Sequence, residues 1–313
     1  LGRGAGSVIY AVREPATGRD YALKHVVREG DKELRWVEQM ETELHISRDF
    51  RQENLRRSFE LHLVRSWTFR TREAFLLMEL VQGESIEDRP LDDMLDIIDT
   101  FTAAARGLEA MHHLGFVHCD FKPNNVLRDE GLGNRPGGPA SVKIIDFGQS
   151  CRTGTVKHRI QGTADYMAPE QLKRQAVTPQ TDVYCFGAAM YWALTRRHVP
   201  TLYTVSRHAG NSFLLTDAID PPEKLNPGTP AGLSHLVMEC VQTNPAKRPA
   251  SMHDVIGRLE IARHVVTKQR EVARHAIINS DLDAALGGAP LPSAPHVPWI
   301  PNPLPPAPPA YMT

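Results

Sequence analysis

The sequence predicts an α+β fold, in which a small β-rich lobe with one helix precedes a larger, mostly helical lobe. Two strand-like runs near the N-terminus, SVIYAVRE and RDYALKHVV, are joined by the turn-like segment PATG at 15–18. Beyond about residue 83, apolar residues instead recur at the spacing of α-helices. We therefore expect an N-terminal lobe over residues 1–80, a C-terminal lobe over residues 81–265 and an extension over residues 266–313.

Helical periodicity predicts one helix in the first lobe and three clear helices in the second. The first-lobe helix is expected over residues 31–47. In the second lobe, residues 94–111 form one apolar face, and Gly115 is a stop signal after it. The segment DVYCFGAAMYWAL is apolar nearly all round, so we expect it to be buried on every side. The segment SMHDVIGRLEIA begins with a Ser-x-x-Asp capping pattern, which predicts a further helix.

Composition excludes several classes of partner and site. The net charge of the 313 residues is −1, so the charge balance does not indicate a nucleic acid or an anionic membrane as the main partner. The four cysteines form no CxxC pair and have no histidine at zinc-finger spacing, which predicts a reduced, cytoplasmic chain without a metal site of that kind. No apolar run reaches the roughly 18 to 20 residues of a membrane span, and no signal peptide precedes the first motif.

The end of the chain is set apart by proline. Residues 290–313 contain ten of the 24 prolines, so we expect this segment to be extended or disordered. A linker to a further segment is the simpler interpretation of this tail, and docking of PNPLPPAPP on an SH3-like or WW-like groove is the alternative. Because the chain opens at Leu1 rather than at a methionine, we expect its natural start to lie upstream.

The first chemical signal is the stretch GRGAGSVIY near the N-terminus. Gly2 and Gly4 lie between strand-like residues, which favours a hairpin whose backbone amides can approach a polyphosphate closely. Lys24 ends the strand-like YALK and could point back under that hairpin. A glycine pair alone usually marks only a turn, and a lone strand lysine is usually a surface charge. The combination of the two is what indicates a phosphate site.

A second polar cluster, HCDFKPNN at 118–125, packs an acid, a lysine and two amides into eight residues after an apolar run. The stretches VKIIDFG at 142–148 and GTADYMAPE at 162–170 follow it. In this order, the motifs resemble the eukaryotic-type (Hanks-type) serine/threonine protein kinase family over roughly residues 1 to 265. The resemblance implies a bilobal protein-kinase fold, ATP and Mg²⁺ as cofactors, and a protein substrate with a serine or threonine acceptor.

The resemblance assigns a nucleotide site to the first lobe. The glycine motif GxGxxG falls on Gly2, Gly4 and Ser7, and the motif VAIK falls on YALK. The stretch FLLMEL at 75–80 resembles the last strand and the hinge of that lobe, with backbone groups for adenine. The implied nucleotide-binding residues are Gly2, Gly4, Ser7, Ile9, Ala22, Lys24, Met78, Glu79 and Val81.

Lys24 would hold the α and β phosphates of ATP, and the family pairs this lysine with a glutamate on the following helix. Glu43 suits this role, because ETELHI resembles the corresponding helix segment. Glu41 is the alternative carboxylate, but residues two apart on a helix point in different directions. We therefore expect a contact between Lys24 and Glu43.

The stretch HCDFKPNN resembles the catalytic loop HRDLKPxN. Asp120 would accept the proton of the substrate hydroxyl, Lys122 would steady the γ-phosphate and Asn125 would hold a magnesium ion. Asp146, in VKIIDFG, would be the other magnesium ligand, a hard oxygen donor of the kind this ion prefers. Phosphoryl transfer depends mainly on positioning and charge neutralisation, so an aspartate, a lysine and an amide on one loop suit it.

Three further contacts are implied in the second lobe. Thr163 in GTADYMAPE would contact Asp120 and Lys122, and Asp182 in TDVYCFG would bond to the backbone of the catalytic loop. Arg248 in NPAKRP corresponds to an arginine that the family pairs with the glutamate of APE, here Glu170. Each of these contacts would hold a loop in place.

The substrate class follows from Lys122, which serine/threonine-specific members of the family carry, and from the APE segment, which indicates a protein acceptor. A pseudokinase scaffold or nucleotide-binding regulatory module is the alternative function. It is disfavoured because Lys24, Glu43, Asp120, Asn125 and Asp146 are all present.

Three departures from the family pattern stand out. Ser7 replaces the third glycine, and residues 129–141 lengthen the hairpin between the two magnesium-ligand motifs, most simply as a tolerated surface loop. Cys119 replaces the arginine of HRD, and a neutral thiol cannot receive the phosphate of a modified activation loop as that arginine does. A cysteine at this position is more often a small buried filler than a redox switch.

Overall fold

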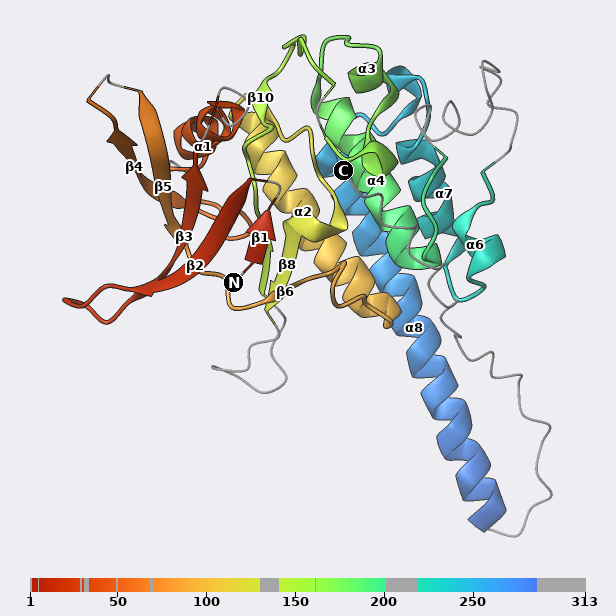
Figure 1. Ribbon diagram of the computed structural model, residues 1–313. Coiled ribbons are helices and arrows are strands. Elements are labelled where there is room, and N and C mark those ends of the chain that lie inside the picture. The colour runs from red at the N-terminus through yellow and green to blue at the C-terminus, as the bar shows by residue number, and fades with distance from the viewer. Residues whose placement is uncertain are drawn as a thin grey trace, which may run out of the picture.

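The computed structural model describes residues 2–4, 6–28, 30, 34–48, 50–67, 70–129, 141–160, 162–200 and 219–285. Figure 1 shows a β-sheet and helix α1 (Leu34–Ser47) on one side of the molecule, and the remaining helices on the other. This arrangement confirms the α+β fold with a β-rich first lobe and a helical second lobe.

The sheet of the first lobe is antiparallel and has the strand order β1-β2-β3-β5-β4. The predicted runs SVIYAVRE and RDYALKHVV form β2 and β3, and Gly18 in the turn between them has φ of 72°, a conformation that glycine adopts without strain. The strands of this sheet are β1 (Gly2–Gly4), β2 (Ser7–Arg13), β3 (Asp20–Val27), β4 (Ser58–Arg65) and β5 (Thr71–Glu79).

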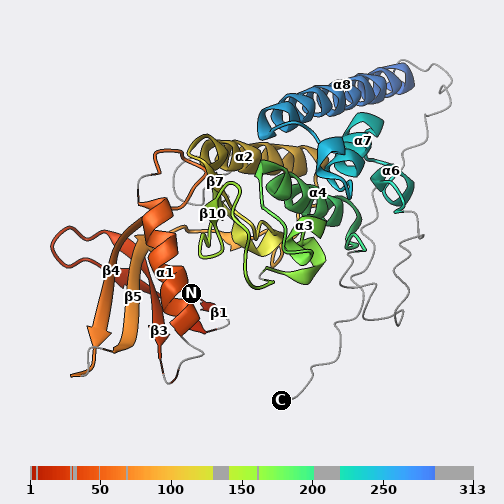
Figure 2. The same ribbon diagram turned by 90° about the horizontal axis from the view of Figure 1, so that it is seen from above.

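Helix α1 (Leu34–Ser47) packs on this sheet, as Figure 2 shows from above, and forms most of the helix predicted over 31–47. Its buried residues Val37 and Met40 meet Val26 of β3 and Leu76 of β5 in a small apolar core. This packing fixes which face of α1 points toward the strands and therefore which carboxylates of the helix are buried.

The second lobe is built around α4, the helix predicted to be buried on every side. All residues of α4 from Thr181 to Thr195 are buried. Helix α2 begins at an Asp93 cap and ends just before Gly115, which has φ of 78°. The helices are α2 (Met94–His113), α3 (Pro169–Leu172), α4 (Pro179–Thr195), α6 (Pro222–Leu225), α7 (Ala231–Cys240) and α8 (Met252–Ala285).

Short strands support the loops at the junction of the lobes. They are β6 (Glu84–Ser85), β7 (Phe116–Val117), β8 (Val126–Asp129), β9 (Ser141–Ile144) and β10 (Cys151–Arg152). One sheet has the order β6-β8-β9, and β7 pairs with β10. Single 3-10 turns lie at Pro123–Asn125, Ala164–Tyr166 and Pro245–Lys247.

Helix α8 is longer than the segment SMHDVIGRLEIA predicts. It lies along α2 in both views, and its second half extends away from the other helices in Figure 1. Residues 268–279 of this half are exposed. The helix crosses residue 265 without a break, so the division of the chain at residues 80 and 265 stays a prediction.

Two predicted features lie outside the described residues: nearly all of the loop at 129–141, and the proline-rich tail at 290–313. Strands β8 and β9 border the loop and pair with each other from Val126 to Asp129 and from Ser141 to Ile144. Within the described ranges, no helix has both the length and the apolar character needed to cross a membrane.

Candidate active site

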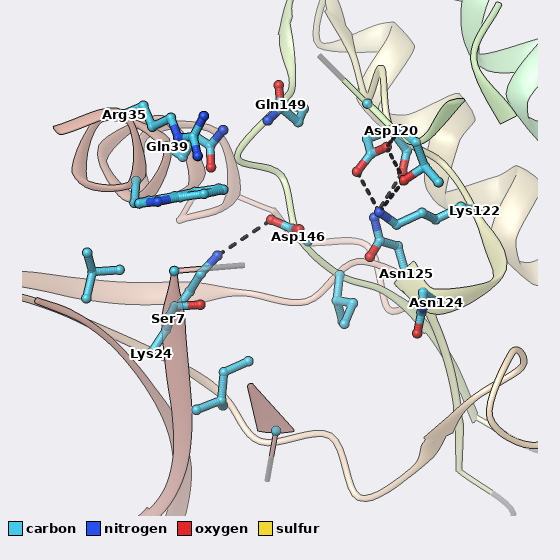
Figure 3. A pocket seen from close by; sticks show the side chains of 18 of the residues that line it. Ser7, Lys24, Arg35, Gln39, Asp120, Lys122, Asn124, Asn125, Asp146 and Gln149 are labelled. Carbon is cyan, nitrogen blue, oxygen red and sulfur yellow. Dashed lines mark hydrogen bonds and ion pairs between the residues drawn. The ribbon is translucent and has the colours of Figure 1, made fainter. Parts of the chain in front are cut away.

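A cavity of about 700 Å³ lies where the two lobes meet. Its walls come from the β1–β2 hairpin, from β3 and α1, and from the loops that contain HCDFKPNN and the DFG stretch of VKIIDFG (Figure 3). The predicted site residues that line it are Gly2, Ser7, Ile9, Lys24, Asp120, Lys122, Asn125 and Asp146. Most of the predicted catalytic and metal-binding residues therefore face one space.

Lys24 and Glu43 make the expected contact, with 2.9 Å between Lys24 Nζ and Glu43 Oε2. Glu43 is fully buried, whereas Glu41 is exposed. The carboxylate of Glu43 also accepts a hydrogen bond from Arg56, through its other oxygen. Burial alone would lower the pKa of Lys24, but the carboxylates of Glu43 and Asp146 outweigh it and the pKa is raised. Lys24 is therefore held as a cation.

Sequence reasoning did not find Arg56. It is 5% exposed, lines the cavity and gives Glu43 a second cationic partner. Its neighbour Arg57 lies at the surface over the ring of Phe59. Two adjacent arginines carry no sequence signal that tells the buried one from the exposed one, so only the packing of α1 against the start of β4 identifies Arg56.

Asp146 faces Lys24 across the cavity, with 3.6 Å between Asp146 Oδ1 and Lys24 Nζ (Figure 3). The charge of Lys24 is the main reason that the pKa of Asp146 falls to about 2, against the opposing effect of burial. Asp146 has φ of 63°, and the next residue, Phe147, is buried edge-on against Phe50 and His118. The packed Phe147 ring thus fixes the backbone that turns Asp146 toward the cavity.

Asp120 is surrounded by donors. Lys122 Nζ lies 3.0 Å from Asp120 Oδ2 and 2.7 Å from Thr163 Oγ1, and the backbone N–H of Thr163 donates to Asp120 Oδ1 at 3.0 Å. Figure 3 shows Asp120 and Lys122 on the side of the cavity away from Lys24. The side-chain amide of Asn125 donates to the backbone carbonyl of Asp120 at 2.9 Å. The contacts expected of Thr163 with Asp120 and Lys122 are therefore present.

The backbone on which Asp120 sits is anchored to α4. Asp182 accepts hydrogen bonds from the backbone N–H of His118 at 2.7 Å and of Cys119 at 2.9 Å, as expected. His112 Nε2 also contacts Asp182 at 2.8 Å, which the sequence did not reveal. Burial by itself would raise the pKa of Asp182. The hydrogen bond and charge of His112, together with the hydrogen bond from the backbone N–H of His118, outweigh burial, and the pKa is lowered. Asp182 is thus kept as an acceptor.

Glu170 and Arg248 form the expected buried pair, with contacts of 2.7 and 2.9 Å between the guanidinium and both carboxylate oxygens. Arg248 also donates to the carbonyls of Gln180 and Gln242. A two-point charge pair with these further bonds fixes the end of the 162–170 stretch against the start of α4. Such a pair positions a loop more than it adds net stability.

The predicted adenine-binding residues are placed less directly. Ala22 and Met78 are buried opposite each other on β3 and β5. The N–H of Glu79 donates to the carbonyl of Arg57, and its carboxylate contacts Lys143 at 2.6 Å. Ala22, Met78, Glu79, Val81 and Gly4 do not line the cavity described here. Their assignment to the nucleotide stays a prediction.

Gly6, between the predicted Gly4 and Ser7, is a further residue that the motif alignment passed over. A β-carbon at Gly6 would lie 2.4 Å from the indole nitrogen of Trp36 on α1. The hairpin can therefore approach the helix only with glycine at this position. The third glycine of GRGAG was the available sequence signal.

The residues around the cavity fit ATP with a magnesium ion. Lys24 supplies a fixed cation for phosphate, while Asp146 and Asn125 supply hard oxygen donors on the opposite wall. Among the described residues, no group of three or more His, Cys, Asp or Glu side chains is arranged to hold a metal by itself. A small donor set suits magnesium, which is usually bound by one or two carboxylates together with substrate phosphates and water.

Comparison with known proteins agrees with this geometry. The chain is 24% identical over 285 residues to a probable serine/threonine-protein kinase of Clostridium acetobutylicum, covering 88% of this chain and 41% of that protein. It is 29% identical over 259 residues to serine/threonine-protein kinase A of Synechocystis, covering 72% of this chain and 47% of that protein. The chain thus spans less than half the length of these curated relatives. The family model of the protein kinase domain matches residues 1–258, and the chain belongs to that family.

Proposed function

We propose that this chain is a serine/threonine protein kinase that transfers the γ-phosphate of ATP to a hydroxyl group of a protein. The observation that carries the proposal is that Lys24, Asp120 and Asp146 face one cavity, each held by named partners. The relatives named above are serine/threonine-protein kinases by name, and Lys122 is the residue that this class carries in the catalytic loop. The free thiols of all four cysteines fit a cytoplasmic location.

In this proposal, Lys24 binds the α and β phosphates and Glu43 orients Lys24. Asp146 and Asn125 hold magnesium, which neutralises phosphate charge when it is bound. In this proposal, the adenine site is formed by Ile9 on the cavity wall, by Ala22 and Met78 on the paired strands β3 and β5, and by Glu79 and Val81.

Asp120 accepts the proton of the substrate hydroxyl in this proposal. Its carboxylate is oriented by Lys122 and by the backbone of Thr163, so the acceptor oxygen is positioned before the substrate arrives. Lys122 lies between Asp120 and Thr163, where it can also reach the transferred phosphate. Hydrogen bonds from the backbone of His118 and Cys119 to Asp182 hold the loop in place when the protein substrate binds.

The test is phosphate transfer from labelled ATP, with magnesium, to the chain itself and to generic serine- and threonine-containing acceptors. Asp120→Ala should lower the rate by about 10²- to 10⁴-fold, the usual contribution of a positioned general base, while ATP binding is retained. The matched control is Asp99→Ala, an exposed aspartate on α2 whose partner is Arg263. If the parent chain bound ATP and transferred nothing, a nucleotide-binding regulatory module would be the better description.

A further inference from the structure

Cys119 and Cys151 form a pair of thiols beside the catalytic loop. Their sulfur atoms are 3.7 Å apart, and both cysteines are free. Cys119 directly precedes Asp120, and Cys151 lies in β10 at the start of the segment that follows DFG. A disulfide bond has a length of about 2.05 Å, so the two sulfurs need to approach by only about 1.7 Å to form one.

The backbone around both sulfurs is fixed in a way that keeps them together. Cys151 pairs with Val117 in the β7–β10 ladder, and Cys119 follows two residues after Val117. The N–H of Cys119 donates to Asp182, and its carbonyl accepts a bond of 2.8 Å from Gln171. Because the main chain is held at these points, the two sulfur atoms would approach each other by rotation of the cysteine side chains.

We propose that Cys119 and Cys151 are a modification site at which a hydroperoxide oxidises the two thiols to a reversible intramolecular disulfide. This inference goes beyond the proposed kinase function and does not depend on it. A cysteine pair that cycles between thiols and a disulfide is the usual form that a disulfide takes in a reducing compartment.

The two thiols are suited to different steps. Hydrogen bonding from Cys119, together with the charge of Lys157, lowers the pKa of Cys151 to about 7, while the same hydrogen bond and burial raise the pKa of Cys119. Cys119 is buried and Cys151 is partly exposed. Cys151 is therefore the thiolate that a peroxide can reach. Cys119 is the buried thiol that reacts with the oxidised Cys151 in the second step.

The reaction balances with one peroxide. The Cys151 thiolate attacks a peroxide oxygen, the O–O bond breaks and the other oxygen leaves as hydroxide, which leaves Cys151 as a sulfenic acid. The sulfur of Cys119 then attacks the sulfur of Cys151, forming the S–S bond as the S–O bond breaks. The departing hydroxide takes the thiol proton of Cys119 and leaves as water. Two thiols are oxidised, one hydrogen peroxide is reduced and two waters form, and a dithiol such as dithiothreitol reverses the change.

The other two cysteines serve as internal controls. Cys185 on α4 and Cys240 on α7 are both buried. Burial raises the pKa of each, to about 12 for Cys240. Neither should react at the rate of Cys151.

The experiment exposes the reduced full chain to hydrogen peroxide, traps remaining thiols with an alkylating agent and maps the peptides by mass spectrometry without reduction. The expected product is the Cys119 peptide linked to the Cys151 peptide, lighter by two hydrogens and restored by dithiothreitol. Cys151→Ser should abolish the link and leave Cys119 reduced. Cys119→Ser should instead let Cys151 accumulate as sulfenic and then sulfinic acid. A double Cys185→Ala, Cys240→Ala variant should form the same link at the parent's rate.

Three results would overturn the proposal. One is accumulation of Cys151 sulfinic acid in the parent chain with no linked peptide, and another is a link between two chains. The third is oxidation of Cys185 or Cys240 within tenfold of the rate of Cys151. A thermal melt of each variant before oxidation shows that the chain is folded, so that an unfolded variant is not scored. Since the readout is a peptide mass, a chain that transferred no phosphate would still give a clear answer.

Discussion

In the small lobe, Lys24 is held at the cavity by charge, through Glu43 at 2.9 Å and Asp146 at 3.6 Å. In the large lobe, Asp120 lies on a loop that is held by hydrogen bonds of its backbone. Two neutral N–H groups of this loop donate to the buried carboxylate of Asp182. The first arrangement joins three elements, β3, α1 and the DFG loop, through contacts between charged side chains. The second is tied to α4, which is buried along almost its whole length.

The difference indicates which half of the site is rigid. Backbone bonds to a buried helix leave little freedom, so the position of Asp120 depends on folding of the large lobe as a whole. The Lys24–Glu43 contact instead depends on where α1 lies, because Glu43 is a side chain of that helix. We therefore expect changes in the large-lobe anchor to affect stability, and changes in the small-lobe cluster to affect nucleotide binding.

The largest effect is expected for Asp182→Asn. The asparagine side chain has only one oxygen that can accept hydrogen bonds, and its NH₂ group would face the backbone N–H groups of His118 and Cys119. At least one of these buried N–H groups would therefore lose its acceptor. We expect a loss of about 3 to 5 kcal/mol in the free energy of unfolding, the range for removing one member of a buried charged network. Urea unfolding followed by fluorescence measures it.

The control for that variant is Asp99→Asn on α2, where the pair with Arg263 is about half exposed on both sides. Exposed pairs contribute about 0 to 1 kcal/mol. A loss below about 1 kcal/mol for Asp182→Asn, equal to the control, would show that α4 does not anchor the loop.

A smaller effect is expected for Arg56→Leu. This change leaves Glu43 Oε1 buried without its cation, so the carboxylate can turn away from Lys24. We expect about a tenfold fall in kcat/KM, equivalent to about 1.4 kcal/mol, expressed mainly as a higher KM for ATP. Arg56→Lys should recover part of it, and Arg57→Leu, at the exposed neighbour, should have little effect. An unchanged KM with a lower kcat would contradict a role through Lys24.

Asp146 links the two halves, and its titration tests that link. Its pKa in the folded chain is about 2, below the ordinary value of 3.8, chiefly because of Lys24. A lowered pKa means that the stability from this carboxylate is fully present above pH 3.8 and is lost as the pH falls through about 2. In Lys24→Met, the carboxyl carbon of Asp146 followed by NMR should titrate closer to 3.8. A midpoint that stays near 2 would mean that other cations hold the charge.

Much of the fold could be predicted because local patterns agreed with the packing. The strand pair with Gly18 in its turn, the N-capped α2 and the fully apolar α4 each have a signal within their own segment. The length of α8 could not be predicted, because residues 268–279 of the helix are all exposed and no buried face imposes a periodicity on them.

The site divides in a similar way. Lys24, Asp120 and Asp146 lie in motifs whose spacing is recognisable, and the structure brings them to one cavity. Arg56 and His112 belong to no motif, because their roles arise from contacts between segments far apart in the chain. The closeness of Cys119 and Cys151 arises in the same way, from the pairing of β7 with β10. Sequence spacing therefore identifies the predicted catalytic residues better than the residues that hold them in place.

The smallest effect concerns the segment after DFG, where Ser150, Thr153 and Thr155 are the candidate phosphorylation sites. Each hydroxyl already donates to a backbone carbonyl: Ser150 to His118 at 3.3 Å, Thr153 to Gly115 at 3.3 Å and Thr155 to Arg152 at 2.6 Å. Ser150 is also buried, which keeps it from a second kinase molecule. The hydrogen bonds of these hydroxyls stabilise the fold of the segment after DFG, as does the pairing of β7 with β10.

The sequence resemblance implies that Cys119 replaces an arginine that receives the phosphate, and a neutral thiol cannot form that charge-assisted bond. On this interpretation, we expect activity to depend little on phosphorylation of this segment. Replacing Ser150, Thr153 and Thr155 together with alanine should leave the transfer rate within a few-fold of the parent. The comparison is Thr163→Ala, which removes the hydroxyl that Lys122 contacts at 2.7 Å and should lower the rate more. A hundredfold loss of rate in the triple variant, about 2.7 kcal/mol of transition-state stabilisation, would contradict this expectation. It would mean that a phosphate on this segment binds another cation, and that the rigid half of the site is also regulated.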